Sequence, residues 1–459
     1  MPKSSDIRVI DAQLYILPVE LRIPLKFGNQ VLTSVKCARV RVRVRTRDGI
    51  EAEGWGETPL SVAWVWPSQL GYNEREERLV DFCRLAGQSL REFDVSGHPL
   101  EVGMDFISGV LPRLKSAQDE QHGESAALPY LAALVAFSPY DIAIHDAFGN
   151  LHGKGVFSLL GSDWLNRDLG YYLEPGKVFN GRYPADYLEP GVNELPVWHL
   201  VGGLDALDPS HLAGNEPDDG YPVLLRDWIR RDGLNCLKVK LRGTDFEWDC
   251  GRLEDIGTIA AEEGVDWLSA DFNCTVTDPG YVNDALDRLK RDSPLTYEKL
   301  LYVEQPFPYD LAANQIDVHS VSDRKPLYMD ESAHDWDYVR MGRSLGWTGV
   351  ALKTCKTLSG ALLSLCWAKQ HKMGLMVQDL TNPMLAQLPH VQLAAHAGTI
   401  MGVESNSMQF YPEESLPEAR IHPGLFRRKN GLLELSSLGP AGFGYRIDEV
   451  EREMPRGHL

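Results

Sequence analysis

The sequence predicts an α/β protein in which a closed barrel of parallel strands follows a small α+β domain. From residue 195 onward, short apolar segments alternate with amphipathic helical segments, which is typical of a parallel sheet. Eight such repeats in one run favour a closed barrel over an open sheet. Upstream, strand-like segments precede helical patterns that continue to about residue 150, as in small α+β domains.

Length and composition limit the classes of protein that this chain can represent. The 459 residues are enough for two domains, one of them large, and the formal net charge of −19 argues against nucleic acid and anionic membrane surfaces as partners. The seven cysteines are dispersed without zinc-like spacing, which indicates reduced thiols and a cytoplasmic setting. Residues 1–6 lack the apolar core of a signal peptide, and no apolar run approaches the about 20 residues of a membrane span.

The first domain is expected to contain three strands followed by helices. We predict strands over residues 7–17 and 35–46 and from residue 51, a loop over residues 21–29, and the clearest helix over residues 131–147. The second strand alternates apolar and basic residues, so we expect the basic stripe from Arg39 to Arg45 on a solvated face.

The chain divides into four predicted parts. An α+β domain covers residues 1–160, an insertion covers residues 161–194, the barrel covers residues 195–430, and a C-terminal segment over residues 431–459 returns to the first domain. The insertion is rich in Tyr, Gly, Asn and Pro, and a loop of this length is usually functional or mobile. We therefore expect it either to close over the site or to form a contact in a homo-oligomer.

The barrel repeats place each predicted element within narrow bounds. Strands are expected at residues 196–201, 235–241, 265–271, 300–304, 326–330, 348–353, 374–378 and 399–404. The helical segments between them include residues 245–263, 280–292, 335–345, 358–371 and 384–397.

Two lysines interrupt one of the buried strands. Strand alternation puts Lys238 and Lys240 on the same face of the segment Leu234–Leu241. An ammonium group on a core-facing strand is costly unless a negative group lies opposite it. A lone strand lysine is usually a surface residue, but the acidic residues that follow make a functional role more plausible here.

Three later strands end in a carboxylate, at Asp271, Glu304 and Asp330, and the next ends in Lys353. Active sites of parallel barrels lie at the carboxyl ends of the strands, so these side chains are expected to converge. Three neighbouring carboxylates repel one another and require a cation, for which oxygen ligands favour Mg²⁺, with Mn²⁺ as the alternative. Asn273 follows Asp271 by two residues and is a candidate to orient the metal ligands.

The chemistry that requires this set of residues is removal of a proton next to a carboxylate. Lys240 and Lys353 would flank the metal on opposite sides, and a lysine near a divalent cation has a lowered pKa that suits a base. The resulting enolate must be stabilised by the metal and by a nearby cation, for which Lys238 is a candidate. One lysine would remove the proton and the other would return it.

These residues resemble the enolase superfamily, specifically its muconate-lactonizing-enzyme (mandelate racemase/muconate lactonizing enzyme) subgroup, over nearly the whole chain. The matching motifs are Gly54-Trp55-Gly56-Glu57, Lys238-Val239-Lys240, Asp271-Phe272-Asn273, Glu304-Gln305-Pro306, Asp330-Glu331-Ser332 and Lys353. The resemblance implies an α+β capping domain over a modified TIM barrel, (β/α)7β, with Mg²⁺ and enolate chemistry. It also implies that Lys240 and Lys353 are the acid/base pair.

Some site assignments remain open at this point. The eighth strand lacks the D-x-D of the family's dipeptide epimerases, and its Glu404 fits a site residue as well as a salt-bridge partner. Asp330 is favoured over Glu331 as the third metal ligand, which leaves Glu331 as a second-shell or substrate-binding candidate. Trp55 and Trp66 lie in or beside loops and serve either to line the cleft or in ordinary packing.

The leading hypothesis is a Mg²⁺-dependent racemase or epimerase acting on a small-molecule carboxylate. Cycloisomerisation and acid-sugar dehydration are alternatives within the same fold. From another class, a barrel glycoside hydrolase would use Glu304 with Glu404, although it would not require the lysines. A non-catalytic descendant that only binds an acid is the third possibility.

Overall fold

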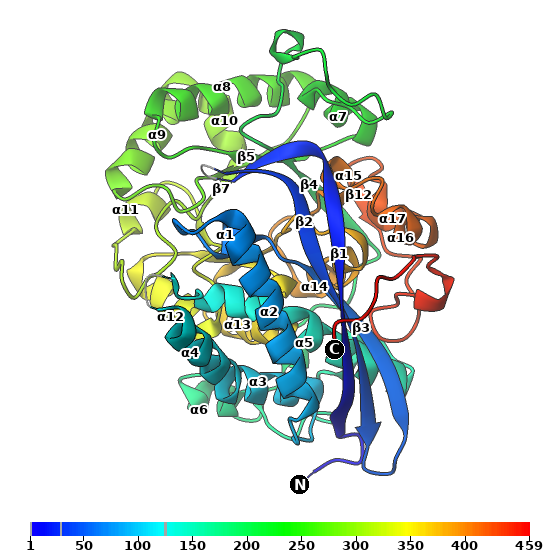
Figure 1. Ribbon diagram of the computed structural model, residues 1–459. Coiled ribbons are helices and arrows are strands. Elements are labelled where there is room, and N and C mark those ends of the chain that lie inside the picture. The colour runs from blue at the N-terminus through cyan, green and yellow to red at the C-terminus, as the bar shows by residue number, and fades with distance from the viewer. Residues whose placement is uncertain (1, 28–29, 124–125) are drawn as a thin grey trace.

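The computed structural model describes residues 2–27, 30–123 and 126–459, and it contains an α+β domain beside an α/β barrel (Figure 1). The first domain has an antiparallel sheet in the order β1 (Ile7–Phe27), β2 (Gln30–Thr46), β3 (Glu51–Pro59). Its helices are α1 (Val62–Val65), α2 (Tyr72–Arg91), α3 (Pro99–Gly109), α4 (Leu111–His122) and α5 (Tyr130–His152). The predicted α+β domain is therefore confirmed.

The loop predicted over residues 21–29 is wrong as far as Phe27, because β1 continues through this stretch. Its pairing with β2 shifts register between Glu20 and Leu25 and then resumes with Leu25 opposite Leu32. Leu25 is buried in an apolar cluster with Phe410 of the barrel domain, so the extension is stabilised by tertiary packing that local periodicity does not reveal. Residues 28 and 29 lie outside the described residues.

The second sheet contains eight parallel strands within the described ranges, in the order β11-β4-β5-β6-β7-β8-β9-β10, with β12 (Leu432–Glu434) antiparallel to β4. The parallel strands are β4 (Glu194–Val201), β5 (Cys236–Lys240), β6 (Trp267–Asp271), β7 (Leu300–Glu304), β8 (Leu327–Met329), β9 (Gly349–Leu352), β10 (Gly374–Val377) and β11 (Val403–Glu404). Between them lie α7 (Leu225–Asp232), α8 (Phe246–Glu263), α9 (Pro279–Asp292), α10 (Pro294–Lys299), α11 (His319–Ser322), α12 (Trp336–Leu345), α13 (Leu358–Gln370) and α14 (Gln387–Ala397).

The sheet curls back on itself, which agrees with the predicted (β/α)7β barrel. β10 and β11 stand at the two ends of the strand order, yet they contact each other. The backbone N–H of Ile400 donates to the carbonyl of Leu375 at 2.9 Å across this junction. Closure of the barrel brings the carboxyl ends of these strands to one rim, where the predicted lysines and carboxylates of the site lie.

The predicted helix boundaries hold where local capping residues define them. α8 begins after Asp245, whose carboxylate accepts a hydrogen bond from the backbone N–H of Trp248. It ends at Gly264, whose φ of 75° is left-handed and suits glycine. Local sequence therefore fixes both ends of this helix, as it fixes several others in the barrel.

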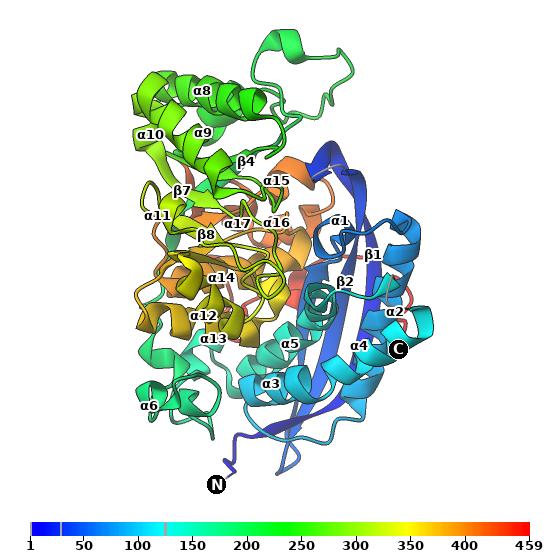
Figure 2. The same cartoon turned by 90° about the vertical axis from the view of Figure 1, so that its left-hand side faces the viewer.

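The segment over residues 161–194 lies against the outer helices rather than over the strand ends. Arg167 pairs with Asp105 of α3 at 2.6 Å, and the Trp367 indole of α13 donates to the Glu174 carbonyl at 2.9 Å. Trp367 is near the end of α13, which precedes the start of β10, so this contact is at the far end of the barrel from the site. Figure 2 shows α6 (Gly176–Phe179) beside α13. A lid over the site is not compatible with this position, whereas the oligomer contact stays a prediction.

The expected solvated face of the basic stripe is wrong at Arg39. Its side chain is buried and pairs with Glu57 at 2.5 Å and with Glu418 of the barrel domain at 2.8 Å. Arg452 of the C-terminal segment also pairs with Glu418, at 2.6 Å. Ionic contacts with distant segments, which the local alternation does not encode, therefore bury this arginine.

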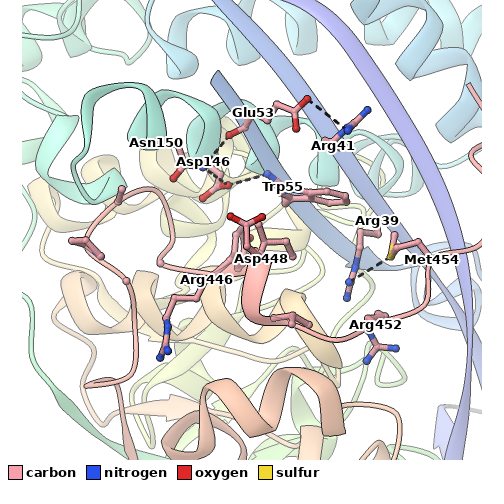
Figure 3. Close-up of a pocket in the computed structure, with 17 residues that line it drawn as sticks. Arg39, Arg41, Glu53, Trp55, Asp146, Asn150, Arg446, Asp448, Arg452 and Met454 are labelled. Carbon is pink, nitrogen blue, oxygen red and sulfur yellow. Dashed lines mark hydrogen bonds and ion pairs between the residues drawn. The ribbon is translucent and has the colours of Figure 1, made fainter. Parts of the chain in front are cut away.

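The C-terminal segment borders a cleft of 700 Å³ beside the first sheet (Figure 3). At its base, Asp146 of α5 accepts hydrogen bonds from the backbone N–H groups of Trp55 at 2.9 Å and Phe443 at 2.7 Å. Burial raises the pKa of Asp146 to about 7. This carboxylate joins three segments that are far apart in sequence, and the boundaries of the domains themselves stay predictions.

The two glycines of Gly54-Trp55-Gly56-Glu57 allow α5 to lie directly on β3. A Cβ atom on Gly54 would be 2.1 Å from the backbone nitrogen of Ala147, and one on Gly56 would be 2.1 Å from the Pro139 carbonyl oxygen. Backbone atoms cannot move aside as a flexible side chain can, so this motif serves packing of the first domain.

None of the helices in the described parts of the chain combines the length and the apolar character that crossing a membrane requires.

We predict that Gly54→Ala destabilises the protein by about 3 kcal/mol, because the added methyl group overpacks the contact with α5. Gly251→Ala is the matched control: this glycine lies inside α8 with no atom within 4 Å of an added Cβ. The control should gain about 0.5–1 kcal/mol from helix propensity. Urea unfolding measures both, and equal effects in the two variants would contradict the packing role.

We predict that Asp146 makes stability fall as pH rises through 7. Its folded pKa is about 7, above its ordinary value of 3.8, so its contribution is complete below about pH 4 and is lost as the buried carboxyl ionises. The free energy of unfolding should lose about 1.4 kcal/mol between pH 6 and 8 from this group. Asp146→Asn should abolish that component, and a wild-type-to-variant difference that is independent of pH would refute it.

Candidate active site

The predicted site residues are brought together inside the barrel mouth. Lys238 and Lys240 come from β5, Asp271 ends β6, Glu304 ends β7, and Glu404 ends β11; Asp330 and Lys353 directly follow β8 and β9. All seven side chains are buried. The strand register sets Lys240 beside Asp271 and Asp271 beside Glu304, so the parallel pairing itself positions them.

Lys238 lies at the centre of the carboxylates. Its Nζ atom is 2.6 Å from Glu304 Oε1, 3.1 Å from Glu404 Oε2 and 3.2 Å from Asp271 Oδ2. Burial alone would lower the pKa of Lys238, but the carboxylates of Glu304 and Glu404 outweigh it and hold that pKa well above its usual value. Lys238 is therefore an ammonium group that neutralises carboxylates from three other strands.

Lys240 and Lys353 occupy opposite sides of this centre. Lys240 Nζ is 2.5 Å from Asp271 Oδ2, whereas Lys353 Nζ is 3.1 Å from Asp330 Oδ2 and donates to the Asp379 carbonyl at 2.7 Å. Burial alone would lower the pKa of Lys353, but nearby carboxylates, chiefly Asp330, together outweigh burial and hold this pKa above its usual value in the chain alone. The expectation of a lowered lysine pKa applies to a lysine beside a bound divalent cation and stays a prediction.

The pKa values of two strand-end carboxyls, Glu304 and Asp330, are shifted in opposite directions. Burial and then the charges of Asp271 and Asp330 raise the pKa of Glu304 well above its usual value. For Asp330, burial acts in the same direction, but Lys353 and Lys356 outweigh it and lower the pKa. Lys356 Nζ lies 3.2 Å from Asp330 Oδ1.

Glu404 combines the two roles left open by the sequence. It lies within the site, where Oε2 pairs with Lys238, and Asn406 Nδ2 donates to Oε1 at 2.9 Å. Glu404 is therefore a salt-bridge partner of Lys238 and lies among the predicted site residues. The Gln378 side chain, which the sequence did not single out, donates to Glu304 Oε2 from β10's carboxyl end.

Two residues orient the carboxylates through hydrogen bonds. The backbone N–H of Asn273 donates to Asp271 Oδ1 at 2.9 Å, and the Asn273 side-chain Nδ2 is 3.5 Å from Oδ2. Gln305 Oε1 accepts from the backbone N–H groups of Asp330 at 2.8 Å and Ser332 at 3.2 Å. The glutamine of the E-Q-P motif therefore holds the D-E-S segment in place.

Trp64 of α1 lies beside the predicted site residues, and the sequence analysis did not single it out. Its ring centroid is 5.1 Å from Lys353 Nζ, and its Nε1 donates to Glu331 Oε1 at 2.9 Å. The two tryptophans considered instead lie elsewhere: Trp55 stacks on Tyr15 in the first domain, and Trp66 packs under Arg78. No local pattern identifies Trp64, because its partners Lys353 and Glu331 are far away in the sequence.

Two cavities open beside this centre, under the first domain. One of 380 Å³ is lined by Lys240 and by residues that follow β5 and β6, and one of 640 Å³ is lined by Trp64 and Glu331. Asn273 and Thr275 border both. The cleft in Figure 3 is larger, but its lining comes from the first sheet, α5 and the C-terminal segment, away from the strand ends.

The three buried carboxylates that converge here are oxygen donors of the type that a hard divalent cation prefers. Lysine ammonium groups supply the positive charge around these carboxylates here. As the side chains stand, no group of three Asp, Glu, His or Cys residues in the described stretches has the arrangement of a metal site. The residue types and their convergence, rather than ligand geometry, connect this site with Mg²⁺.

The fold and the strand-end lysines and acids define an α/β-barrel protein with a buried charged centre. Residues 222–451, half of the chain, match the family described as enolase C-terminal domain-like. The chain belongs to this family, and the predicted family resemblance is confirmed. No curated protein sequence matches the chain.

Solved structures from the same superfamily share the fold over nearly their whole length. A dipeptide epimerase from Enterococcus faecalis, solved with Mg and L-Leu-L-Tyr, has a TM-score of 0.61 and 17% identity and covers 95% of this chain and 99% of its own. A muconate lactonizing enzyme from Mucobacterium Smegmatis, complexed with muconolactone, has a TM-score of 0.59 and 16% identity, and the match covers 95% of this chain and 96% of that one. An enolase from Bradyrhizobium, complexed with magnesium and mandelic acid, has a TM-score of 0.59 and 16% identity, and the match covers 99% of this chain and 100% of that one. At these identities the similarity establishes the fold.

We predict that Lys238→Met destabilises the protein by about 3–5 kcal/mol at pH 7, because it leaves Glu304 and Glu404 buried without their ammonium partner. Lys177→Met is the control: this lysine is exposed on α6, and its loss should change stability by less than about 0.5 kcal/mol. Urea unfolding measures both variants. A loss below about 1 kcal/mol for Lys238→Met would show that other groups carry the charge balance.

Proposed function

We propose that the protein is a Mg²⁺-dependent enzyme that removes the proton alpha to a carboxylate, and that it acts as a racemase or epimerase. The observation that carries the proposal is the placement of Lys240 and Lys353. They project from β5 and from the end of β9, and the carboxylates Asp271, Glu304 and Asp330 come from the three strands between them. An acid bound over these carboxylates would have one amine on each side.

Asp271, Glu304 and Asp330 are the residues that would hold the metal ion, with Asn273 orienting Asp271. Bound there, Mg²⁺ would supply positive charge that stabilises negative charge on the substrate carboxylate and favours the neutral form of a neighbouring amine. The magnesium in two of the similar structures supports the choice of ion, and Mn²⁺ remains the alternative.

The chain's own residues support proton transfer between two faces of one carbon. A lysine that returns a proton must be an ammonium, which is the state that Asp330 favours in Lys353. Lys240 lines the open cavity and is therefore placed to reach a bound acid from the other side. Lys238 keeps the buried carboxylates neutralised, and Trp64 covers Lys353 from the first domain.

Cycloisomerisation and acid-sugar dehydration use the same initial step and remain alternatives that product identification would separate. The glycoside hydrolase alternative is weaker, because Glu304 and Glu404 both bind the Lys238 ammonium and neither is arranged as an acid opposite a nucleophile. A non-catalytic acid-binding protein would bind without exchange. A homo-oligomer also stays a prediction.

We predict that the enzyme exchanges the alpha proton of its substrate with deuterated solvent in the presence of Mg²⁺, and that EDTA abolishes the exchange. A library of carboxylic acids, monitored by NMR, provides the measurement. Lys240→Ala and Lys353→Ala should each reduce exchange by at least about 10³-fold on one face, within the range for general acid/base groups.

Lys177→Ala, on the surface of α6, should exchange at the wild-type rate and controls for the preparation. Exchange that survives in both Lys240→Ala and Lys353→Ala would rule out the lysine pair. Turnover of glycosides after EDTA treatment would instead favour the hydrolase.

A further inference from the structure

The cavity of 640 Å³ lies between α1 and the segments that follow β6, β7 and β8. Figure 2 shows α1 on the side of the first domain that faces the barrel. The lining residues that carry polar or aromatic groups include Trp64, Cys274, Tyr309, Asp310, Asn314 and Glu331. This cavity borders the proposed reaction centre through Asn273, which holds Asp271.

The Glu331 carboxyl lines this cavity, and one of its two oxygens has no hydrogen-bond partner. Its side chain is 95% buried, since its exposed fraction is 5%, and Oε1 accepts the Trp64 hydrogen bond. Oε2 is buried without a hydrogen-bond partner, and no ion pair to Glu331 is present in the described residues. The Cys274 thiol lies nearby, but a thiol is a weak donor and does not satisfy a buried carboxylate. A donor group from outside the chain could therefore complete the hydrogen bonding of this carboxyl.

The two cavities at the barrel mouth differ in the sign of their charge. Among the described residues, Glu331 and Asp310 are the charged ones that line the larger cavity, and no lysine or arginine joins them. Lys26, Lys240 and Arg242 line the smaller cavity, where the described part of the chain contributes no acidic residue. A positively charged group is thus repelled from one cavity and attracted to the other.

Aromatic side chains add to this preference. Trp64 and Tyr309 both line the acidic cavity, and such rings attract ammonium and guanidinium groups through their π faces. Lys353 contacts Trp64 but is not among the residues that line the cavity. The cavity therefore offers a carboxylate oxygen and aromatic surface to a cation that enters from the reaction centre.

We propose that this cavity is a specificity subsite for a cationic arm of the substrate, an alkylammonium or a guanidinium, whose charge pairs with Glu331 Oε2. The proposal rests on the proposed function, because the arm belongs to the acid whose alpha proton is removed. It identifies the substrate class as carboxylic acids that carry a positive charge on a side chain, such as derivatives of basic amino acids.

The test uses three probes with one common scaffold: Nα-acetyl-lysine, Nα-acetyl-norleucine and Nα-acetyl-glutamate. They differ in carrying a cationic, a neutral or an anionic arm. Solvent-deuterium incorporation with Mg²⁺ measures kcat/KM, and calorimetry measures binding to the full chain. We expect the lysine probe to be preferred over norleucine by at least about tenfold in both measurements, mainly through KM, because a charged hydrogen bond to Glu331 is available to the lysine probe alone.

Glu331→Gln keeps an oxygen to accept from Trp64 and removes the charge. It should lower the lysine-to-norleucine ratio to about one. Glu413→Gln, an exposed residue in a different cavity, is the matched control and should leave that ratio unchanged. Weak or absent binding of the lysine probe, or an equal loss for all three probes in Glu331→Gln, would overturn the subsite.

The outcomes also separate the subsite from the reaction. Binding that prefers the lysine probe and depends on Glu331, but occurs without exchange, would support the subsite and contradict the proposed function. Exchange without any preference for the cationic arm would support the function and contradict the subsite.

Discussion

The pairing of Lys238 with carboxylates from β6, β7 and β11 is the interaction on which the rest of the site depends. Charges buried this deeply are tolerated only when each has a close partner of opposite sign. The parallel register brings the acids to one rim, and the lysines make it possible to keep them there. The same carboxylates are the groups that the proposed reaction requires, so stability and chemistry use one set of side chains.

The two domains contribute different parts of the site. The barrel supplies the lysines and acids through strand ends, whose positions are fixed by the hydrogen-bonded ladder. The first domain supplies Trp64 on α1, a helix of four residues, and borders both cavities. Because α5 packs so closely on β3 at Gly54, the sheet and the helices of this domain form one rigid support for that contribution.

Most of the barrel could be predicted from the sequence, because its strands are short apolar runs and its helices carry local caps such as Asp245. The lysine spacing in β5 and the strand-end acids likewise follow from periodicity alone. The extension of β1 to Phe27, the burial of Arg39 and the position of Trp64 could not be predicted. Each of them depends on a partner hundreds of residues away, and no local pattern encodes that partner.

Residues 161–194 connect α3 of the first domain with α13 of the barrel domain. Arg167 fastens this segment to α3, and Glu174 fastens it to α13, while Arg39 and Glu418 join the domains on another side. A hinge that swings the domains apart would have to break the buried Arg39–Glu418 ion pair, because this pair joins the first domain to the barrel domain. The two cavities beside the first domain and the strand ends offer small molecules a place at the site that requires no separation of the domains.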